Sequence, residues 1–170
     1  MKAIFLDRDG VINEERKDYV KNLEEFKIFD NVSDAISLLK KENFLVVIIT
    51  NQSAINRKLL SVENLENIHK FLKKYLEKNN TSIDGIYYCP HTPDECCSCR
   101  KPKPGLLIQA SLDLNIDLKN SWMIGDSKTD LDAAKAVGCK SILLNKNEKL
   151  FDIVKELISN NKSNEDGLNG

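Results

Sequence analysis

The stretch IFLDRDGVIN, residues 4–13, is an apolar run that ends at two aspartates, Asp7 and Asp9. In a strand, residues i and i+2 share a face, so the two carboxylates point the same way and repel each other. A cation beside them would relieve this repulsion. The stretch therefore predicts a strand that delivers an acidic pair to a cation-binding site.

The composition is that of one ordinary globular domain. Of the 170 residues, 41% are hydrophobic and 30% are charged, which is close to average usage and enough for one core. We predict a single domain over residues 1–159. The segment after about Ser159 lacks apolar periodicity, so residues 160–170 are expected to form a flexible tail.

Charge and hydropathy exclude several classes of partner. The chain has 25 basic and 26 acidic side chains, a net charge of −1, so no overall field favours nucleic acid or an anionic membrane. No apolar run approaches the roughly 20 residues needed to cross a bilayer. We expect a cytoplasmic protein without a membrane or nucleic-acid partner, and a monomer because no exposed apolar stripe is evident.

Strand and helix patterns alternate along the chain. Apolar runs predict strands at 2–6, 44–50, 85–89, 121–126 and 140–144. Helical spacing predicts helices at about 32–39, 65–76, 105–114, 130–137 and 148–159. This alternation predicts an α/β fold with a doubly wound parallel sheet covered on both faces.

Polar clusters follow the predicted strands. Ligands bind where the carboxyl ends of such strands converge, and the side chains there are Asp7 and Asp9, then Thr50 and Asn51, then Asp126 and Asp130. The basic segment RKPKPG, residues 100–105, joins them. Carboxylate oxygens suit Mg²⁺, while Lys and Thr hold phosphate oxygens, so the pattern favours a phosphate ester. Glycine fingerprints of the dinucleotide or P-loop type are lacking.

Four of the five cysteines, Cys89, Cys96, Cys97 and Cys99, crowd into one polar segment. A disulfide framework would spread its cysteines along the chain. Three thiolates with His91 suit a tetrahedral, structural Zn²⁺ site without an open position, and Cys96 could replace Cys97 in it. The isolated Cys139 is expected to be a small buried residue.

Four motifs in order carry a resemblance to a known family. DRDG (7–10), TNQS (50–53), RKPKPG (100–105) and GDSKTD (125–130) resemble the motifs of the haloacid dehalogenase (HAD) superfamily of phosphatases. One such motif alone is weak, but four in order are specific. The resemblance spans residues 1 to about 145 and implies a Rossmann-like core with a minimal cap or none.

The resemblance also implies the chemistry of a phosphoric monoester hydrolase. Asp7 would be the nucleophile that forms an aspartyl-phosphate, and Asp9 would protonate the leaving alkoxide and then activate water. Mg²⁺ would be held by Asp7, the backbone carbonyl of Asp9 and Asp126, with Asp130 in support. The implied phosphate- and substrate-binding residues are Thr50, Asn51, Gln52, Arg100 and Lys101.

The cysteine segment CPHTPDECCSCRKPKPG, residues 89–105, resembles the zinc loop of one branch of this superfamily. That branch contains the histidinol-phosphate and D-glycero-D-manno-heptose 1,7-bisphosphate phosphatases. Its pattern places C-x-C directly before the basic motif, which favours Cys97 over Cys96. The implied zinc ligands are Cys89, His91, Cys97 and Cys99.

The resemblance implies a small phosphorylated metabolite as the substrate. Residues 11–29 match the substrate-side flap of the branch in general form, whereas Ala54 and NRK (56–58) depart from its usual glycine and Ala-Arg-Gly segment. We rank the heptose bisphosphate first, at its 7-phosphate, because the chain is not fused to a second histidine-pathway domain. Histidinol phosphate is the alternative.

Plainer interpretations exist for each motif. Asp7 and Asp9 could form a solvated turn, Thr50 and Asp126 could cap helices, and Lys101 could be a solvated charge. A non-catalytic relative that binds a phosphorylated ligand is a further alternative, and a phosphotransferase or phosphonatase would ordinarily need a larger cap. The plainer interpretations do not explain why four clusters fall at matching positions, so the catalytic hypothesis is preferred.

Overall fold

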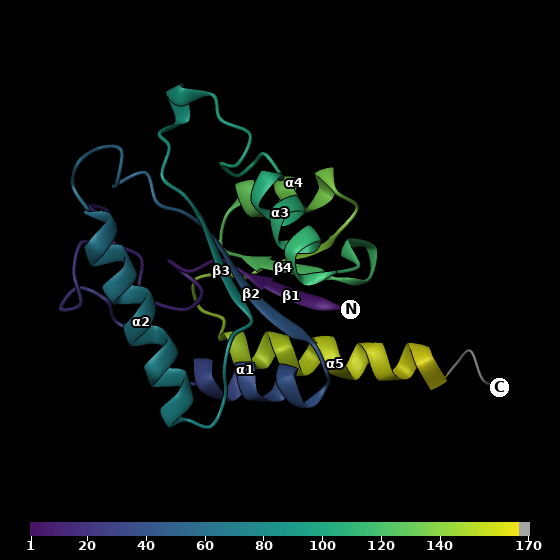
Figure 1. The fold of residues 1–170 in the computed structure, drawn as a ribbon. Helices are drawn as coiled ribbons and strands as arrows, with labels where there is room; N and C mark the ends of the chain where they lie inside the picture. The colour runs from purple at the N-terminus through teal and green to yellow at the C-terminus, as the bar shows by residue number, and fades with distance from the viewer. Residues whose placement is uncertain (167–170) are drawn as a thin grey trace.

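The structure is a computed structural model and describes residues 1–166. Five strands form one parallel sheet in the order β3-β2-β1-β4-β5, seen nearly edge-on in Figure 1. They are β1 (Ala3–Leu6), β2 (Leu45–Asn51), β3 (Gly85–Cys89), β4 (Trp122–Gly125) and β5 (Lys140–Leu143). Every predicted strand is present with its ends within one residue of the predicted ones.

The helices occupy the predicted places but differ at their ends. They are α1 (Val32–Lys41), α2 (Val62–Lys78), α3 (Gly105–Leu114), α4 (Lys128–Ala136) and α5 (Leu150–Asp166), with short 3₁₀ turns η1 (Pro93–Glu95) and η2 (Leu118–Asn120). α2 begins before its apolar pattern because Ser61 caps it, its side chain accepting a hydrogen bond from Asn64 N at 3.1 Å.

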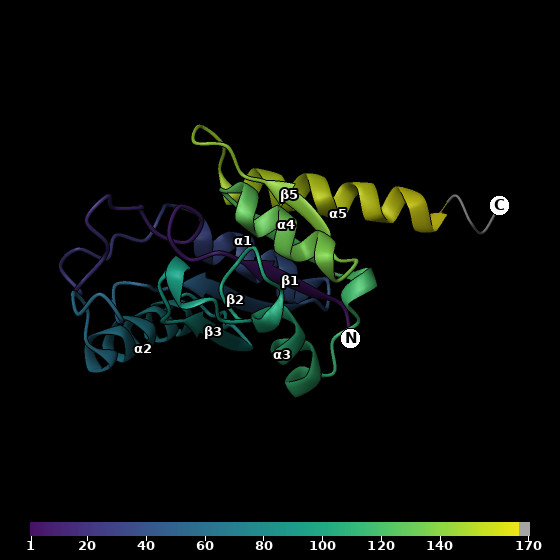
Figure 2. The same ribbon diagram turned by 90° about the horizontal axis from the view of Figure 1, so that it is seen from above.

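The two faces of the sheet pack against different helices. Successive strand side chains point to opposite faces, so Ile4 and Leu6 join a core cluster with residues of α1, α2 and α5, whereas Ala3 and Phe5 join one with residues of α3 and α4. Figures 1 and 2 show these two helical layers on either side of the sheet. Burial on both faces explains why the central strands are continuously apolar, and the doubly wound α/β prediction is confirmed.

The last helix is longer than predicted. α5 continues to Asp166, whereas the sequence pattern placed the start of a flexible tail at residue 160. Leu157 and Ile158, near the end of the predicted part, are buried in the core cluster. Within the extension, Lys162 Nζ lies 2.8 Å from Oε1 of Glu42, the residue just after α1. The remainder of the expected tail, residues 167–170, lies outside the described residues.

Long connections gather at the carboxyl end of the sheet. Residues 7–31, between β1 and α1, contain isolated β-bridges but no helix of their own.

Cys139 is buried, as predicted. Over residues 1–166, no helix is long and apolar enough to cross a membrane.

Candidate active site

Asp7 and Asp9 lie on a tight turn directly after β1. The carbonyl oxygen of Arg8 accepts hydrogen bonds from the backbone N–H groups of residues 11–13, at 2.8 to 3.3 Å. Gly10 has φ 85° and faces Asp126, whose carboxylate a Cβ at Gly10 would overlap. Glycine is therefore required at position 10 for two reasons: the backbone there has a positive φ, and Asp126 approaches too closely for a side chain.

Lys101 lies among the carboxylates at the centre of the site. Its Nζ is 2.9 Å from Asp7 Oδ1 and 2.6 Å from Asp130 Oδ1, and it donates to the Ile49 carbonyl oxygen at 2.9 Å. Burial acts to lower the pKa of Lys101, but Asp7 and Asp130 outweigh it and raise the pKa overall. The side chain is therefore a buried cation.

Asp7, Asp126 and Asp130 each present a carboxylate oxygen within 4.8 Å of the others. Burial, with Asp130 and Asp9 nearby, raises the pKa of Asp7 to about 7 against the opposing effect of Lys101. Burial, with Asp130 and Glu15 nearby, raises the pKa of Asp126 to about 6. Three carboxylates this close together repel one another, and a bound cation would relieve the repulsion. Carboxylate oxygens are ligands that Mg²⁺ prefers, so the residues fit this ion.

Asp130 is fixed by the start of α4. Its Oδ2 accepts hydrogen bonds from Ser127 N at 3.1 Å and Ser127 Oγ at 2.7 Å. The first of these belongs to a capping box, in which the Ser127 side chain also accepts from the backbone N–H of Asp130. Its Oδ1 meets Lys101. A Cβ at Gly125 would collide with the Asp130 side chain, so the glycine in GDSKTD leaves room for this carboxylate.

The carboxylate of Asp9 has a different set of partners. Arg8 Nη2 lies 2.9 Å from both Asp9 oxygens, Asn13 Nδ2 donates to Oδ1 at 2.9 Å, and Gln52 Nε2 donates to Oδ2 at 2.8 Å. Burial acts to raise the pKa of Asp9, but Arg8 and these hydrogen bonds lower it below 3.8 overall. The side chain keeps 24% of its surface exposed, so the carboxylate still faces the site.

Thr50 and Asn51 are the last two residues of β2, one residue further into the strand than the sequence predicted, and Gln52 follows it. Their side chains have distinct surroundings. Asn51 exchanges two hydrogen bonds with the backbone of Lys101, both 3.1 Å long. Gln52 is 5% exposed; its amide nitrogen donates to Thr50 Oγ1 at 2.8 Å as well as to Asp9. Asn51 thus ties β2 to the basic segment, and Gln52 joins Thr50 to Asp9.

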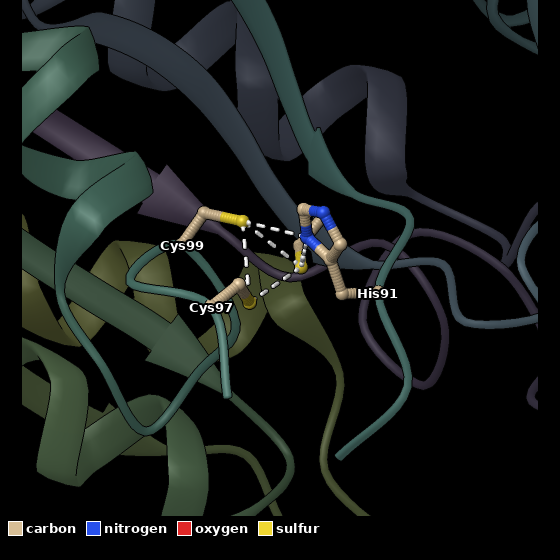
Figure 3. Close-up of side chains that lie close together, drawn as sticks. His91, Cys97 and Cys99 are labelled. Atoms are coloured by element: carbon tan, nitrogen blue, oxygen red, sulfur yellow. Dashed lines mark hydrogen bonds between the residues drawn. The ribbon is translucent and has the colours of Figure 1, made fainter. Parts of the chain in front are cut away.

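The sulfur atoms of Cys89, Cys97 and Cys99 and a ring nitrogen of His91 all lie within 4.8 Å of one another, and Figure 3 shows His91, Cys97 and Cys99 pointing toward one another. His91 Nδ1 lies 3.3 Å from Cys89 Sγ and 3.2 Å from Cys99 Sγ, and Cys89 Sγ lies 3.6 Å from Cys97 Sγ. Cys96 is exposed and is not in the group. The four donors are those of a closed tetrahedral Zn²⁺ site, so the residues fit that ion.

The cysteine group is directly connected to the basic segment. Arg100 N donates to Cys97 Sγ at 3.3 Å, and Arg100 Nη1 donates to the His91 carbonyl oxygen at 3.1 Å. Gly105, at the start of α3, packs so closely on Ser98 and Cys99 that a Cβ there would collide with their backbone. The fold of this loop therefore sets where Lys101 enters the carboxylate cluster.

Two residues at the site were missed by sequence reasoning, Arg8 and Asn13. Both are fully buried and both contact Asp9. Both lie within residues 4–13, next to the acidic pair, and this position could have indicated a role at the site. Arginine and asparagine are mostly exposed in proteins, however, so burial was not expected. Only the fold of the turn shows that these two side chains point inward.

Comparisons with known proteins show the family of the chain. The HAD-hydrolase-like family model matches residues 98–155. The D-glycero-beta-D-manno-heptose-1,7-bisphosphate 7-phosphatase of Neisseria meningitidis serogroup A is 41% identical over 144 residues, which are 85% of this chain and 77% of that protein. The enzyme of the same name from Pseudomonas putida is 44% identical over 144 residues, 85% of this chain and 82% of its own.

A solved structure has the same fold. The D,D-heptose 1,7-bisphosphate phosphatase of B. bronchiseptica, crystallised with magnesium and phosphate, superposes with a TM-score of 0.89 at 32% identity and covers 94% of this chain and 99% of its own. A HAD-like phosphatase from Mesorhizobium loti matches with a TM-score of 0.77 at 28% identity, over 84% of this chain and 72% of that one.

Proposed function

Because the chain belongs to the HAD-like hydrolases, in the family of the D-glycero-beta-D-manno-heptose-1,7-bisphosphate 7-phosphatases, we propose that it is an Mg²⁺-dependent phosphatase that removes the 7-phosphate of D-glycero-D-manno-heptose 1,7-bisphosphate. The observation that carries this proposal is the buried Lys101 ammonium, 2.9 Å from Asp7 and 2.6 Å from Asp130. It lies among the carboxylates that fit the cation, where a phosphate dianion would need positive charge.

Asp7 is assigned as the nucleophile. Its Oδ1 accepts a hydrogen bond from Arg8 N at 2.7 Å and meets Lys101 at 2.9 Å, which fixes the orientation of the carboxylate. Among the described residues Oδ2 has no hydrogen-bond donor, and we assign it to attack phosphorus. The new Asp7 oxygen–phosphorus bond forms as the ester bond to the sugar oxygen breaks.

Asp9 is assigned as the acid and then the base. It gives a proton to the departing sugar oxygen, which leaves as an alcohol. In the second half-reaction it takes a proton from the water that attacks the phosphorus of the aspartyl-phosphate, which releases inorganic phosphate and restores Asp7. Lys101 and Thr50 are assigned to the phosphate oxygens, and Arg100 to the second anionic or polyhydroxyl group.

Both metals belong to the proposal. Mg²⁺ would be held by Asp7, the backbone carbonyl of Asp9 and Asp126, with Asp130 in support, and when bound it would neutralise charge on the transferring phosphoryl group. The presence of magnesium and phosphate in the B. bronchiseptica structure supports the use of Mg²⁺. Zn²⁺ on Cys89, His91, Cys97 and Cys99 would hold the loop that carries Arg100 and Lys101.

The test is Mg²⁺-dependent release of phosphate from heptose 1,7-bisphosphate, with histidinol phosphate as the competing substrate and Asp7→Asn as the blank. A clear preference for the heptose bisphosphate, abolished in Asp7→Asn, is expected. A preference for histidinol phosphate would overturn the substrate assignment but leave the reaction intact. Equal inactivity of wild type and variant on both would favour a non-catalytic, ligand-binding relative. We further propose that the protein is a monomer located in the cytoplasm, where reducing conditions keep the three thiols of the group available to zinc.

A further inference from the structure

The guanidinium of Arg8 is buried directly behind the carboxylate of Asp9. Arg8 has no exposed surface at all, and its Nη2 reaches both Asp9 oxygens at 2.9 Å and Gln52 Oε1 at 3.2 Å. The guanidinium carbon lies 5.6 Å from the centre of the Phe26 ring, an arrangement that further restrains it. A cation is therefore fixed against the side of Asp9 that faces the protein.

Neutral donors hold the same carboxylate from other directions. Asn13 Nδ2 donates to one oxygen at 2.9 Å and also to the Glu14 carbonyl oxygen at 3.0 Å, so the asparagine is itself held by the backbone. Gln52 Nε2 donates to the other oxygen at 2.8 Å. With three side chains on its two oxygens, the Asp9 carboxylate cannot rotate without breaking a charge-assisted hydrogen bond.

Arg8 contributes little to the rest of the structure through hydrogen bonds. Its Nε and Nη1 are buried and find no partner among the described residues, although a buried donor without a partner is costly. All of its side-chain hydrogen bonds go instead to Asp9 and Gln52 through Nη2. Because Arg8 is fully buried, it cannot contact a substrate directly, and its hydrogen bonds can affect one only through these two residues.

We propose that Arg8 is a positioning residue for catalysis: together with Asn13 and Gln52, it fixes the carboxylate of Asp9 in the orientation required for proton transfer. This inference rests on the proposed role of Asp9 as acid and base. It assigns Gln52 to the support of Asp9 and Thr50, in place of direct contact with the substrate phosphate that the sequence resemblance implied.

The test compares the activity of Arg8→Met on two substrates that have different leaving groups. The parameter kcat/KM reports steps up to formation of the aspartyl-phosphate, in which an alkyl leaving group needs a proton and p-nitrophenolate does not. For the variant we expect kcat/KM to fall about 100-fold with the sugar phosphate and to change by less than about 3-fold with p-nitrophenyl phosphate. Equal losses on both substrates would overturn the proposal.

A double variant separates positioning from a general structural effect. If Arg8 acts through Asp9, adding Arg8→Met to Asp9→Asn should cause no further loss with the sugar phosphate, because the acid is already absent. A further loss would overturn the proposal. Lys40→Met is the matched control, since it breaks a partly buried pair with Asp84, 2.7 Å long, near the opposite end of the sheet, and it should not alter the ratio between the two substrates.

Two further measurements cover the case in which Arg8→Met does not fold and the case in which the wild type is inactive. If Arg8→Met does not fold, Asn13→Ala removes one donor from Asp9 without removing a charge, and it should produce the same selective loss at smaller size, about 10-fold. Equal losses on both substrates in Asn13→Ala would count against the proposal. Inactivity of the wild type on both phosphate esters would instead overturn the proposed function itself.

Discussion

The ammonium of Lys101 lies 2.9 Å from Oδ1 of Asp7, and the lysine side chain is only 2% exposed. A lone buried ammonium or carboxylate would be strongly unfavourable, so each of these groups makes the burial of the other possible. Asp130, at 2.6 Å, adds a second negative charge. The pairing joins the end of β1 to the loop that contains the cysteine group, so segments far apart in the chain form the proposed active site.

Lys101→Met should lower both stability and activity. Removing the cation leaves Asp7 and Asp130 buried without their partner, and breaking such a pair costs about 3–5 kcal/mol. The free energy of unfolding from urea titrations, without and with Mg²⁺, measures this. Added Mg²⁺ should recover part of the loss, while phosphate release stays at least about 100-fold reduced. Lys70→Met, at an exposed position on α2, is the control, and an equal loss there would contradict the argument.

Gly10→Ala should weaken the binding of Mg²⁺. The added methyl group would overlap the Asp126 carboxylate, and the backbone at φ 85° disfavours alanine. We expect the Mg²⁺ concentration for half-maximal activity to rise by at least about 10-fold, since the supporting geometry of a metal site governs its affinity to this extent.

Gly138→Ala provides the matched control for Gly10→Ala. It has a similar φ of 70°, but a methyl group there would meet only Lys119 Cγ, at 3.9 Å. This variant should lose about 1–2 kcal/mol of stability and keep the Mg²⁺ dependence of the wild type. A shift in Mg²⁺ dependence in both variants would show that backbone strain, and not contact with Asp126, is the cause.

Cys97→Ser and Cys96→Ser should differ in zinc content. Cys97 belongs to the group of four donors, whereas the neighbouring Cys96 is exposed and outside it. We expect about one zinc ion per chain in the wild type and in Cys96→Ser, and nearly none in Cys97→Ser. Metal analysis of the purified proteins measures this. Loss of zinc in Cys96→Ser alone would assign the ligand to the other cysteine.

His69 should make the protein less stable in mild acid. Burial, assisted by Arg8 and Lys73, lowers the pKa of His69 to about 3. Because the folded imidazole stays neutral while the unfolded one takes up a proton below about pH 6.5, stability contributed at pH 7 is lost as the pH falls toward 3. Between pH 6.5 and 5 this group alone accounts for at most about 2 kcal/mol.

Urea unfolding of wild type and His69→Leu at pH 5, 6.5 and 8 measures this effect. The variant should lose less stability between pH 6.5 and 5 than the wild type does. Between pH 6.5 and 8 the two should differ by no more than about 0.4 kcal/mol, because the unfolded imidazole is half protonated at pH 6.5 and neutral at pH 8 while the folded one is neutral at both. Parallel behaviour across the whole range would contradict the lowered pKa.

The elements of the fold follow from local patterns. The continuous apolar runs that became β1 and β2, and the helical spacing of Leu65, Ile68 and Leu72 in α2, are visible because burial imposes a period on the chain. The helix ends were less predictable, since they depend on individual contacts. The cap formed by Ser61 lets α2 begin before its first apolar residue. In the part of α5 that the sequence did not predict, Lys162 contacts Glu42.

The sequence by itself determined the sheet, its alternation with helices, and the residue types that gather at its carboxyl edge, because these depend on periodicity and on motifs within single segments. Only the tertiary structure decided which side chains meet: that Lys101 lies between Asp7 and Asp130, that Cys97 and not Cys96 joins the cysteine group, and that the buried Arg8 supports Asp9. The reason is physical. Burial and pairing of charges depend on distances between segments far apart in the chain, which a local pattern does not contain.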